Sequence, residues 1–282
     1  MRGRSVSGTG APDPSARLPP VLLLGGGRMG GAMLAGWLER GLAPSVVVDP
    51  APSAAALAGP FVRVVPDPDL VPEDFRPAAM VIAVKPQTAP EALPRLARHA
   101  KGAVLLSIMA GRTIAGIRDM LGQDGPIVRA MPNTPAAIRQ GVTVACAGPG
   151  VTAAQRELCD ALLSAVGAVA WVEKEALLDP VTAISGGGPA YVFLLAELLE
   201  QAGLAQGLPP DLARMLARGT VSGSGALLGA SAEDAAALRR AVTSPKGTTE
   251  RALAVLMDEA AWPRLVAQAI EAATQRSREL AT

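Results

Sequence analysis

Residues Val21-Leu22-Leu23-Leu24-Gly25-Gly26-Gly27-Arg28-Met29-Gly30 decide the fold of the first part of the chain. The run Val21–Leu24 is continuously apolar, which is typical of a parallel strand buried on both faces. A glycine-rich turn follows, with the spacing Gly-x-Gly-x-x-Gly, and a helical pattern begins within it. A strand, this turn and a helix in that order are the context in which the motif predicts dinucleotide binding.

Each glycine of the motif has its own structural role. Gly25 allows the tight turn, Gly27 lets the backbone approach a pyrophosphate, and Gly30 permits close packing of the helix on the strand. The N-terminus of the helix then offers unpaired N–H groups and a favourable dipole to the phosphates. A glycine-rich turn that binds no ligand is the structural alternative.

Asp49 ends a second predicted strand, Ser45–Asp49, and stands 19 residues after Gly30 (49 − 30). A carboxylate at this place accepts hydrogen bonds from the ribose hydroxyls and repels a 2′-phosphate. No arginine follows within the next four residues, so the sequence favours NADH over NADPH as the cofactor. Alternatively, Asp49 is only a turn residue before Pro50.

The pattern of elements predicts a Rossmann-type α/β domain followed by an all-helical domain. Further short strands are expected at Met80–Val84, Ala103–Ile108 and Pro126–Arg129, and their alternation with helices indicates a parallel sheet covered on both faces. After Glu173 the pattern is helical only. We expect a disordered tail at 1–19, a dinucleotide-binding domain at 20–172 and a helical substrate and dimerisation domain at 173–282. Helices are expected at Pro189–Ala202, Pro209–Leu228, Ala232–Val242, Thr248–Glu259 and Pro263–Leu280.

The composition excludes several classes of function. The chain has 282 residues with 26 Lys and Arg against 25 Asp and Glu, so it lacks the cationic excess that nucleic-acid binding requires. One histidine and two cysteines leave no metal site built from those ligands and no disulfide framework. Cys146 and Cys159 are expected to be apolar core residues rather than a redox pair. His99 is expected at a solvated helix end and not as a catalytic base.

The sequence favours a protein of the cytoplasm with no membrane partner. We expect none of its apolar stretches to reach the roughly 18 to 20 residues that a membrane-spanning helix needs. The first twenty residues carry arginines among Ser, Gly and Pro and lack the apolar core of a signal peptide.

Two loops in the helical half have unusual compositions. Ser185–Tyr191 places three glycines before a helix that begins at a proline, so that neighbouring backbone can approach closely. Val242–Thr249 carries several hydroxyl side chains and precedes another helix, where hydroxyls and N–H groups can converge on a small carboxylate. Helix capping by Ser or Thr is the structural alternative for the second loop.

Taken together, these motifs resemble the pyrroline-5-carboxylate reductases, and the resemblance extends from Val21 to Leu280. The motifs that carry it occur in the same order along the chain. They are the Gly25–Gly30 turn, Ala83–Pro86, Ser107–Gly111, Arg129–Pro135, Ser185–Tyr191, Gly207–Pro209 and Val242–Thr249.

The resemblance implies reduction of the cyclic imine 1-pyrroline-5-carboxylate to L-proline by hydride transfer from NADH or NADPH. It implies that Ser244, Gly247, Thr248, Thr249 and Glu175 hold the substrate, with the Thr249 hydroxyl near the imine nitrogen as the catalytic group. The cofactor residues that it implies are Gly25, Gly27, Arg28, Met29, Gly30, Asp49, Ala83, Val84, Lys85, Pro86, Ala110 and Asn133.

The resemblance also implies a homodimer formed through the helical half, with a decamer as a further step. Small residues from Gly219 to Gly229 are compatible with close helix packing between chains, although packing within one chain would use them equally well. The chain departs from the family at Gly187, where Ser is usual, and at Lys246, where a second glycine is usual. If that loop position has a positive φ, the lysine is strained.

Two other readings of the sequence stay open. One is another two-domain dehydrogenase or an imine reductase. Such enzymes commonly place a lysine or an aspartate on the first long helix of the second domain to handle a proton, and the helix that begins at Tyr191 offers no lysine. The other is a nucleotide-binding regulator without activity, against which the intact motifs at both sites argue.

Overall fold

The computed structural model describes residues 18–281, so most of the predicted tail lies outside the described residues. The chain divides into two compact units. The first unit runs to Gly186 and also contains the end of the chain from Arg276, whereas the second unit comprises Gly187–Gln275. The last strand, β8 (Gly167–Val172), ends where the sequence predicts the domain boundary, but the second unit begins at Gly187, 14 residues after the predicted start at 173 (187 − 173).

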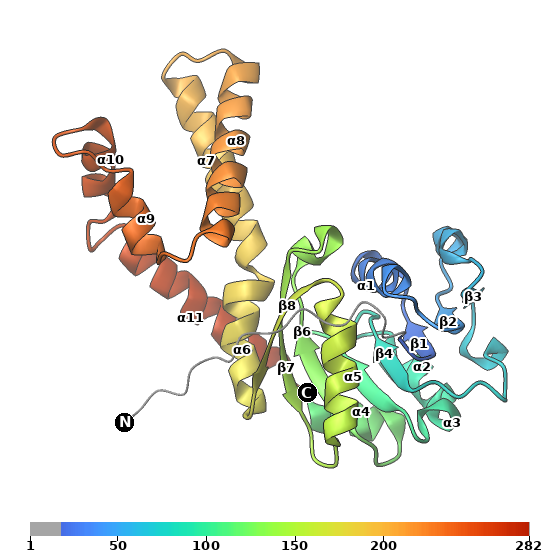
Figure 1. The fold of residues 1–282 in the computed structure, drawn as a ribbon. Coiled ribbons are helices and arrows are strands. Elements are labelled where there is room, and N and C mark those ends of the chain that lie inside the picture. Colours follow the sequence, from blue (N-terminus) through green and yellow to red (C-terminus); the bar gives the residue numbers. More distant parts are fainter. Residues whose placement is uncertain (1–17, 282) are drawn as a thin grey trace. The chain divides into compact units, whose positions relative to one another are not determined.

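The first unit is built on an eight-stranded sheet with the order β3-β2-β1-β4-β5-β6-β7-β8 (Figure 1). Neighbouring strands are parallel except for β6 and β7, which are antiparallel, so the predicted parallel sheet is confirmed apart from that one pair. The strands are β1 (Val21–Leu24), β2 (Ser45–Val48), β3 (Val62–Val65), β4 (Ala79–Ile82), β5 (Val104–Ser107), β6 (Ile127–Met131), β7 (Gly141–Ala147) and β8 (Gly167–Val172).

Helices cover both faces of this sheet, as the alternating pattern predicted. They are α1 (Arg28–Glu39), α2 (Ala89–Arg95), α3 (Ala97–Ala100), α4 (Ile114–Leu121), α5 (Ala153–Ser164) and α6 (Leu178–Val181). Short 3-10 helices lie at η1 (Pro52–Leu57), η2 (Pro68–Leu70), η3 (Thr134–Ile138) and η4 (Glu175–Leu177), and η5 (Thr182–Gly186) is a π-helix.

Successive residues of β1 point into two separate hydrophobic cores. Leu23 packs with α1 and α5 on one face, in a cluster that includes Trp37 and Leu162. Leu22 lies in the other cluster, which α2, α3 and α4 cover. All four residues of β1 are buried, which explains why the strand is apolar at every position.

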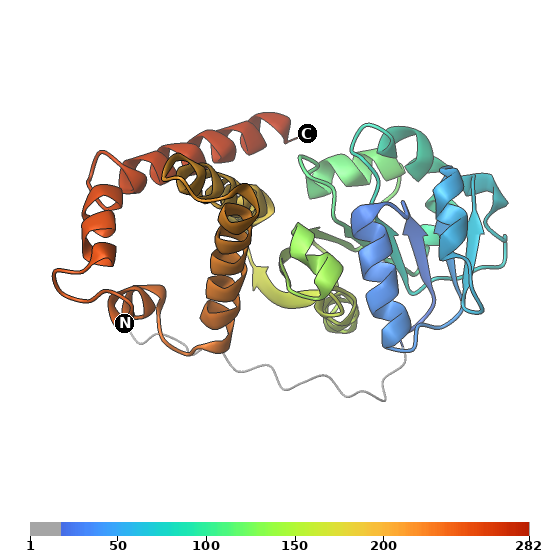
Figure 2. The ribbon, with the colours of Figure 1, turned by 90° about the horizontal axis from the view of Figure 1, so that it is seen from above.

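The second unit contains α7 (Gly188–Ala205), α8 (Pro210–Ala230), α9 (Ala235–Ala241), α10 (Thr248–Leu256) and most of α11 (Trp262–Leu280). These match the five predicted helices to within a few residues. Helices α7 and α8 form a hairpin, and α9 and α10 stand apart from it in Figures 1 and 2. Because α7 has no buried residue and α8 buries only Ala213 and Ala217, the unit leaves most of its apolar surface exposed.

The structure corrects the prediction for His99 and supports that for the cysteines. His99 is fully buried rather than solvated, and its Nδ1 lies 3.1 Å from the carbonyl oxygen of Phe75 while its Nε2 accepts from Arg98. Burial lowers the pKa of His99, because the charged form loses its water. Cys146 and Cys159 are both free and buried, and burial raises the pKa of Cys159 to about 12.

We expect the buried His99 to make stability depend on pH. In the unfolded chain His99 takes up a proton at about pH 6.5, whereas in the folded chain its lowered pKa keeps the ring neutral to a lower pH. The contribution of His99 to the free energy of unfolding is therefore fully present above about pH 6.5 and is lost as the pH falls below that value. Thermal melts between pH 5 and pH 8 should show this loss, and His99→Gln should flatten the profile over the same range. A melting temperature of the unchanged chain that holds constant or rises toward pH 5 would contradict the assignment.

Candidate active site

The glycine turn between β1 and α1 leaves no room for side chains at two of its positions. Gly25 has a φ of 98°, and a Cβ there would lie 2.8 Å from the carbonyl group of Ala83. A Cβ on Gly30 would lie 2.0 Å from the carbonyl oxygen of Gly25. In contrast, a Cβ on Gly27 would meet no atom of the protein within 4 Å.

The space around these three glycines agrees with the separate roles that the motif assigns to them. Gly25 and Gly30 are required by the fold itself, whereas the backbone at Gly27 faces open space at the first turn of α1. Gly27 is the N-cap of α1 and no side chain caps it, so N–H groups of the first turn are available to an anion. The turn therefore fits the pyrophosphate of a dinucleotide.

Asp49 follows β2 and binds back to the turn. Its Oδ2 accepts a hydrogen bond of 2.7 Å from the Gly26 N–H, and its Oδ1 accepts one of 2.8 Å from the Ala51 N–H. The side chain thus stabilises both the glycine turn and its own loop, which supports the turn alternative, while its role toward the ribose stays a prediction. Each carboxylate oxygen retains a second lone pair that can accept from a ribose hydroxyl.

The segment Ala83–Pro86 leaves β4 beside this turn. The N–H of Ala83 donates to the carbonyl oxygen of Leu24 at 2.8 Å, which holds the two strand ends together. Arg112 Nη2 donates to the Pro86 carbonyl oxygen at 3.3 Å, and the exposed Ala110 lies just before it at the end of β5. These residues of the predicted cofactor set lie at the carboxyl ends of neighbouring parallel strands, where α/β sheets bind ligands.

Asn133 connects the loop after β6 to the glycine-rich segment of the π-helix η5. Its side-chain amide donates to the Ser185 hydroxyl at 3.2 Å, and its Oδ1 accepts from the Val142 N–H at 2.8 Å. Short π-helical turns are rare and are often found at functional sites. The family resemblance implies a cofactor role for Asn133, and the structure adds this hydrogen bond to Ser185.

Glu175 has a partner that the sequence did not indicate. Its Oε1 accepts from the Ile114 N–H at 2.8 Å and from Arg129 Nη1 at 3.0 Å. Arg129 is 2% exposed, and its Nε and Nη2 have no partner among the described residues. Glu175 Oε2 forms no hydrogen bond with any residue from 18 to 281, so this oxygen is available to a ligand.

The loop between α9 and α10 has a left-handed residue at its centre. Lys246 has a φ of 60°, and its N–H donates to Glu250 Oε2 at 2.8 Å. The Gly247 N–H donates to the Ser244 carbonyl oxygen at 3.0 Å, which closes a tight turn. The lysine therefore occupies a conformation that favours glycine, as the departure from the family pattern suggested.

The hydroxyls of this loop do not cap α10. The N-cap is Gly247, with no side-chain hydrogen bond, so the capping alternative fails. Within residues 18–281 the hydroxyls of Ser244, Thr248 and Thr249 form no hydrogen bond, and all three residues are exposed. They lie together at the N-terminal end of a helix and are available to a small anion.

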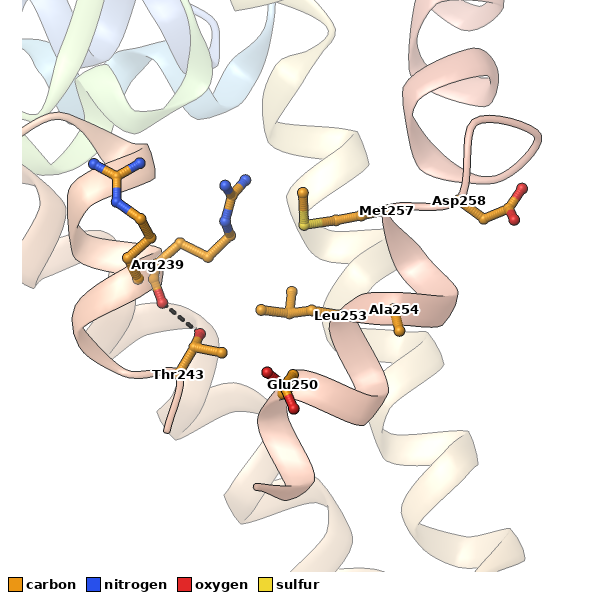
Figure 3. Close-up of a pocket in the computed structure, with 8 residues that line it drawn as sticks. Arg239, Thr243, Glu250, Leu253, Ala254, Met257 and Asp258 are labelled. Carbon is orange, nitrogen blue, oxygen red and sulfur yellow. Dashed lines mark hydrogen bonds between the residues drawn. The ribbon is translucent and has the colours of Figure 1, made fainter. Parts of the chain in front are cut away.

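A separate groove of about 450 Å³ lies between α9 and α10. Figure 3 shows apolar Leu253 and Met257 facing the arginine side chains of α9, with the Thr243 hydroxyl donating to the Arg239 carbonyl oxygen at 2.7 Å. Of the predicted substrate residues, this groove contains none in the described part of the chain.

The sequence of this chain is similar to those of known proteins. Residues 175–280 match the family described as pyrroline-5-carboxylate reductase dimerisation, and residues 20–111 match the family described as NADP oxidoreductase coenzyme F420-dependent. The pyrroline-5-carboxylate reductase of Pseudomonas aeruginosa is 39% identical over 271 residues, covering 93% of this chain and 97% of that protein. The chain belongs to the pyrroline-5-carboxylate reductase family.

Solved structures agree with this assignment. A pyrroline-5-carboxylate reductase from Coxiella burnetii has a TM-score of 0.85 at 31% identity, covering 94% of this chain and 99% of that one. A pyrroline carboxylate reductase from Plasmodium falciparum with NADP bound has a TM-score of 0.79 at 26% identity, covering 94% and 99%. The Rossmann-type unit and the helical dimerisation region of the family both correspond to parts of this chain.

Two substitutions separate the folding role of the glycine turn from its binding role. Gly30→Ala should lower the free energy of unfolding by about 1–3 kcal/mol or more, because the new Cβ overlaps the Gly25 carbonyl oxygen. Gly27→Ala should leave thermal stability unchanged and weaken NADH binding, since its Cβ enters only the space a pyrophosphate needs. Melting curves and fluorescence titrations measure the two effects; equal loss of stability in both variants would refute the distinction.

Proposed function

We propose that this chain reduces 1-pyrroline-5-carboxylate to L-proline, the last reaction of proline biosynthesis, with NADH or NADPH as the reductant. The observation that carries this proposal is the set of exposed hydroxyls at Ser244, Thr248 and Thr249, which have no hydrogen-bond partner among residues 18–281, in a member of this family. The glycine turn of the first unit is the proposed binding site of the cofactor.

The residues of the substrate loop hold the carboxylate of the substrate. The N–H groups at the start of α10 and the Ser244 and Thr248 hydroxyls donate to it, while the helix dipole adds a favourable field. Thr249 orients the imine nitrogen through its hydroxyl. Glu175 contacts the substrate through Oε2, because its Oε1 already accepts hydrogen bonds from Arg129 and the Ile114 N–H.

A protonated imine is already an electrophile, so the protein needs no strong acid or base. The dinucleotide, when bound, supplies a hydride from C4 of its nicotinamide to the imine carbon. Catalysis by the chain then depends on holding the two carbons in reacting geometry and on excluding other orientations. This explains why the lone histidine, buried beside Phe75, has no part in the reaction.

A spectrophotometric assay tests the proposal against the two rival functions. Oxidation of NADH or NADPH that depends on pyrroline-5-carboxylate and yields proline is the expected result. Nucleotide binding without turnover would identify a regulator. Turnover of other cyclic imines, with none of pyrroline-5-carboxylate, would identify an imine reductase.

Thr249→Ala tests the catalytic hydroxyl. It should lower kcat/KM for pyrroline-5-carboxylate by about 10- to 100-fold through loss of positioning, with little effect on NADH affinity. Thr249→Ser keeps the hydroxyl and should retain most of the activity. Steady-state kinetics with unchanged turnover in the alanine variant would remove Thr249 from the mechanism.

The chain uses NADH in preference to NADPH within this proposal. The carboxylate of Asp49 lies at the end of β2, beside the turn, and carries negative charge where NADPH has its 2′-phosphate. The NADP named for the Plasmodium falciparum structure is a property of that relative.

Asp49→Ser tests this preference. Loss of the charge should raise the ratio of kcat/KM for NADPH to that for NADH by about 10-fold. Because the variant also loses the hydrogen bond to the Gly26 N–H, melting curves should accompany the kinetics. An unchanged ratio in a folded variant would show that Asp49 does not discriminate between the cofactors.

Self-association accounts for the apolar surface of the second unit. The helical run Glu175–Ala205, 31 residues, is long and apolar enough to cross a membrane, contrary to the sequence-based expectation, and only 6% of its most apolar window is buried. The dimerisation family covers this run, so a second copy of the chain covers it in the proposed dimer. A ring of five dimers in the cytoplasm is the larger assembly that we propose, and light scattering distinguishes its mass from that of a dimer.

A further inference from the structure

A pocket of about 260 Å³ lies in the first unit at the carboxyl ends of its parallel strands. Val48 and Pro50, the neighbours of Asp49, form one part of its wall. Asp67 lies just after β3, and Glu91 and Arg95 come from α2. The pocket therefore brings the chain neighbours of Asp49, the predicted ribose-binding residue, together with a second group of charged side chains.

Arg95 is held by two carboxylates. Its Nη2 donates to Asp67 Oδ1 and, at 2.5 Å, to Asp69 Oδ2, while its Nε donates to Asp69 Oδ1 at 3.2 Å. The hydrogen bond and charge of Asp69 raise the pKa of Arg95, and the Arg95 guanidinium lowers that of Asp69. Arginine is the one cation among the residues that line this pocket.

We propose that Asp67 and Asp69 select against NADPH by engaging Arg95 and keeping the cofactor pocket negative. This inference rests on the proposed use of a nicotinamide dinucleotide and deepens it. An arginine near the end of β2 is the usual partner of the 2′-phosphate in this kind of fold, because its planar guanidinium pairs with phosphate oxygens. Here the guanidinium already has two anionic partners.

The charge of the pocket favours the same outcome. Asp67, Glu91 and Arg95 sum to −1 among the lining residues, Asp69 pairs with Arg95, and Asp49 stands in the chain between the lining residues Val48 and Pro50. This negative charge repels the 2′-phosphate of NADPH, which NADH lacks. The rest of the cofactor is common to both nucleotides, so the repulsion weakens binding of NADPH selectively. Removal of the carboxylates therefore changes binding of the phosphorylated nucleotide selectively.

Titration with 2′,5′-ADP and 5′-AMP tests the inference without any need for turnover. Asp69→Asn, and more strongly Asp67→Asn with Asp69→Asn, should raise affinity for 2′,5′-ADP by about fivefold or more and change affinity for 5′-AMP less than about twofold. Adding Arg95→Gln to the double variant should remove the gain. Asp69 is the milder site, because Asp67 Oδ1 also accepts from the Asp69 N–H at the start of η2.

Asp124→Asn is the matched control. Asp124 pairs with Arg118 in the same unit, is 96% exposed and does not line the pocket, so its loss should leave both affinities unchanged. The inference would be overturned if the double variant, shown by melting curves to be folded, had the same ratio of affinities for 2′,5′-ADP and 5′-AMP as the control. A gain that survives Arg95→Gln would overturn the role of Arg95. Binding of neither nucleotide by the unchanged chain would instead refute the proposed cofactor site.

Discussion

The approach of α1 to β1 is the constraint on which the rest of the first unit depends. Gly30 lies so close to the carbonyl oxygen of Gly25 that a Cβ would stand 2.0 Å from it. This approach directs the first turn of the helix toward the carboxyl ends of the strands. Asp49 then fixes the turn through the Gly26 N–H, and the pocket that contains Arg95 lies next to it. One close backbone contact thus determines where a dinucleotide can lie.

The second unit obeys a different constraint, because it buries almost none of its own apolar surface. Phe193, Leu194 and Leu198 of α7 are each more than half exposed, and the whole helix lacks a buried residue. Such a surface needs a partner in water. Membership of the dimerisation family supplies a second copy of the chain as that partner. Stability of this unit and assembly are therefore coupled.

The sequence predicts those elements whose signal lies within a short stretch of the chain. The glycine turn, five strands and five helices of the second half follow from continuous apolar runs and helix signals. Strand β7 and its antiparallel pairing depend on contacts with β6, which no local pattern carries. Likewise, burial of His99 and the pairing of Glu175 with Arg129 join residues 24 and 46 positions apart. Only the folded chain brings those groups together.

The central claim is transfer of a hydride from a bound dinucleotide to the imine carbon of pyrroline-5-carboxylate. Mass spectrometry of proline formed with NADH deuterated at C4, on each face in turn, tests it most directly. The account predicts one deuterium at C5 of proline with one of the two labelled cofactors and none with the other. Unlabelled proline with both cofactors, or oxidation of NADH without formation of proline, would contradict it.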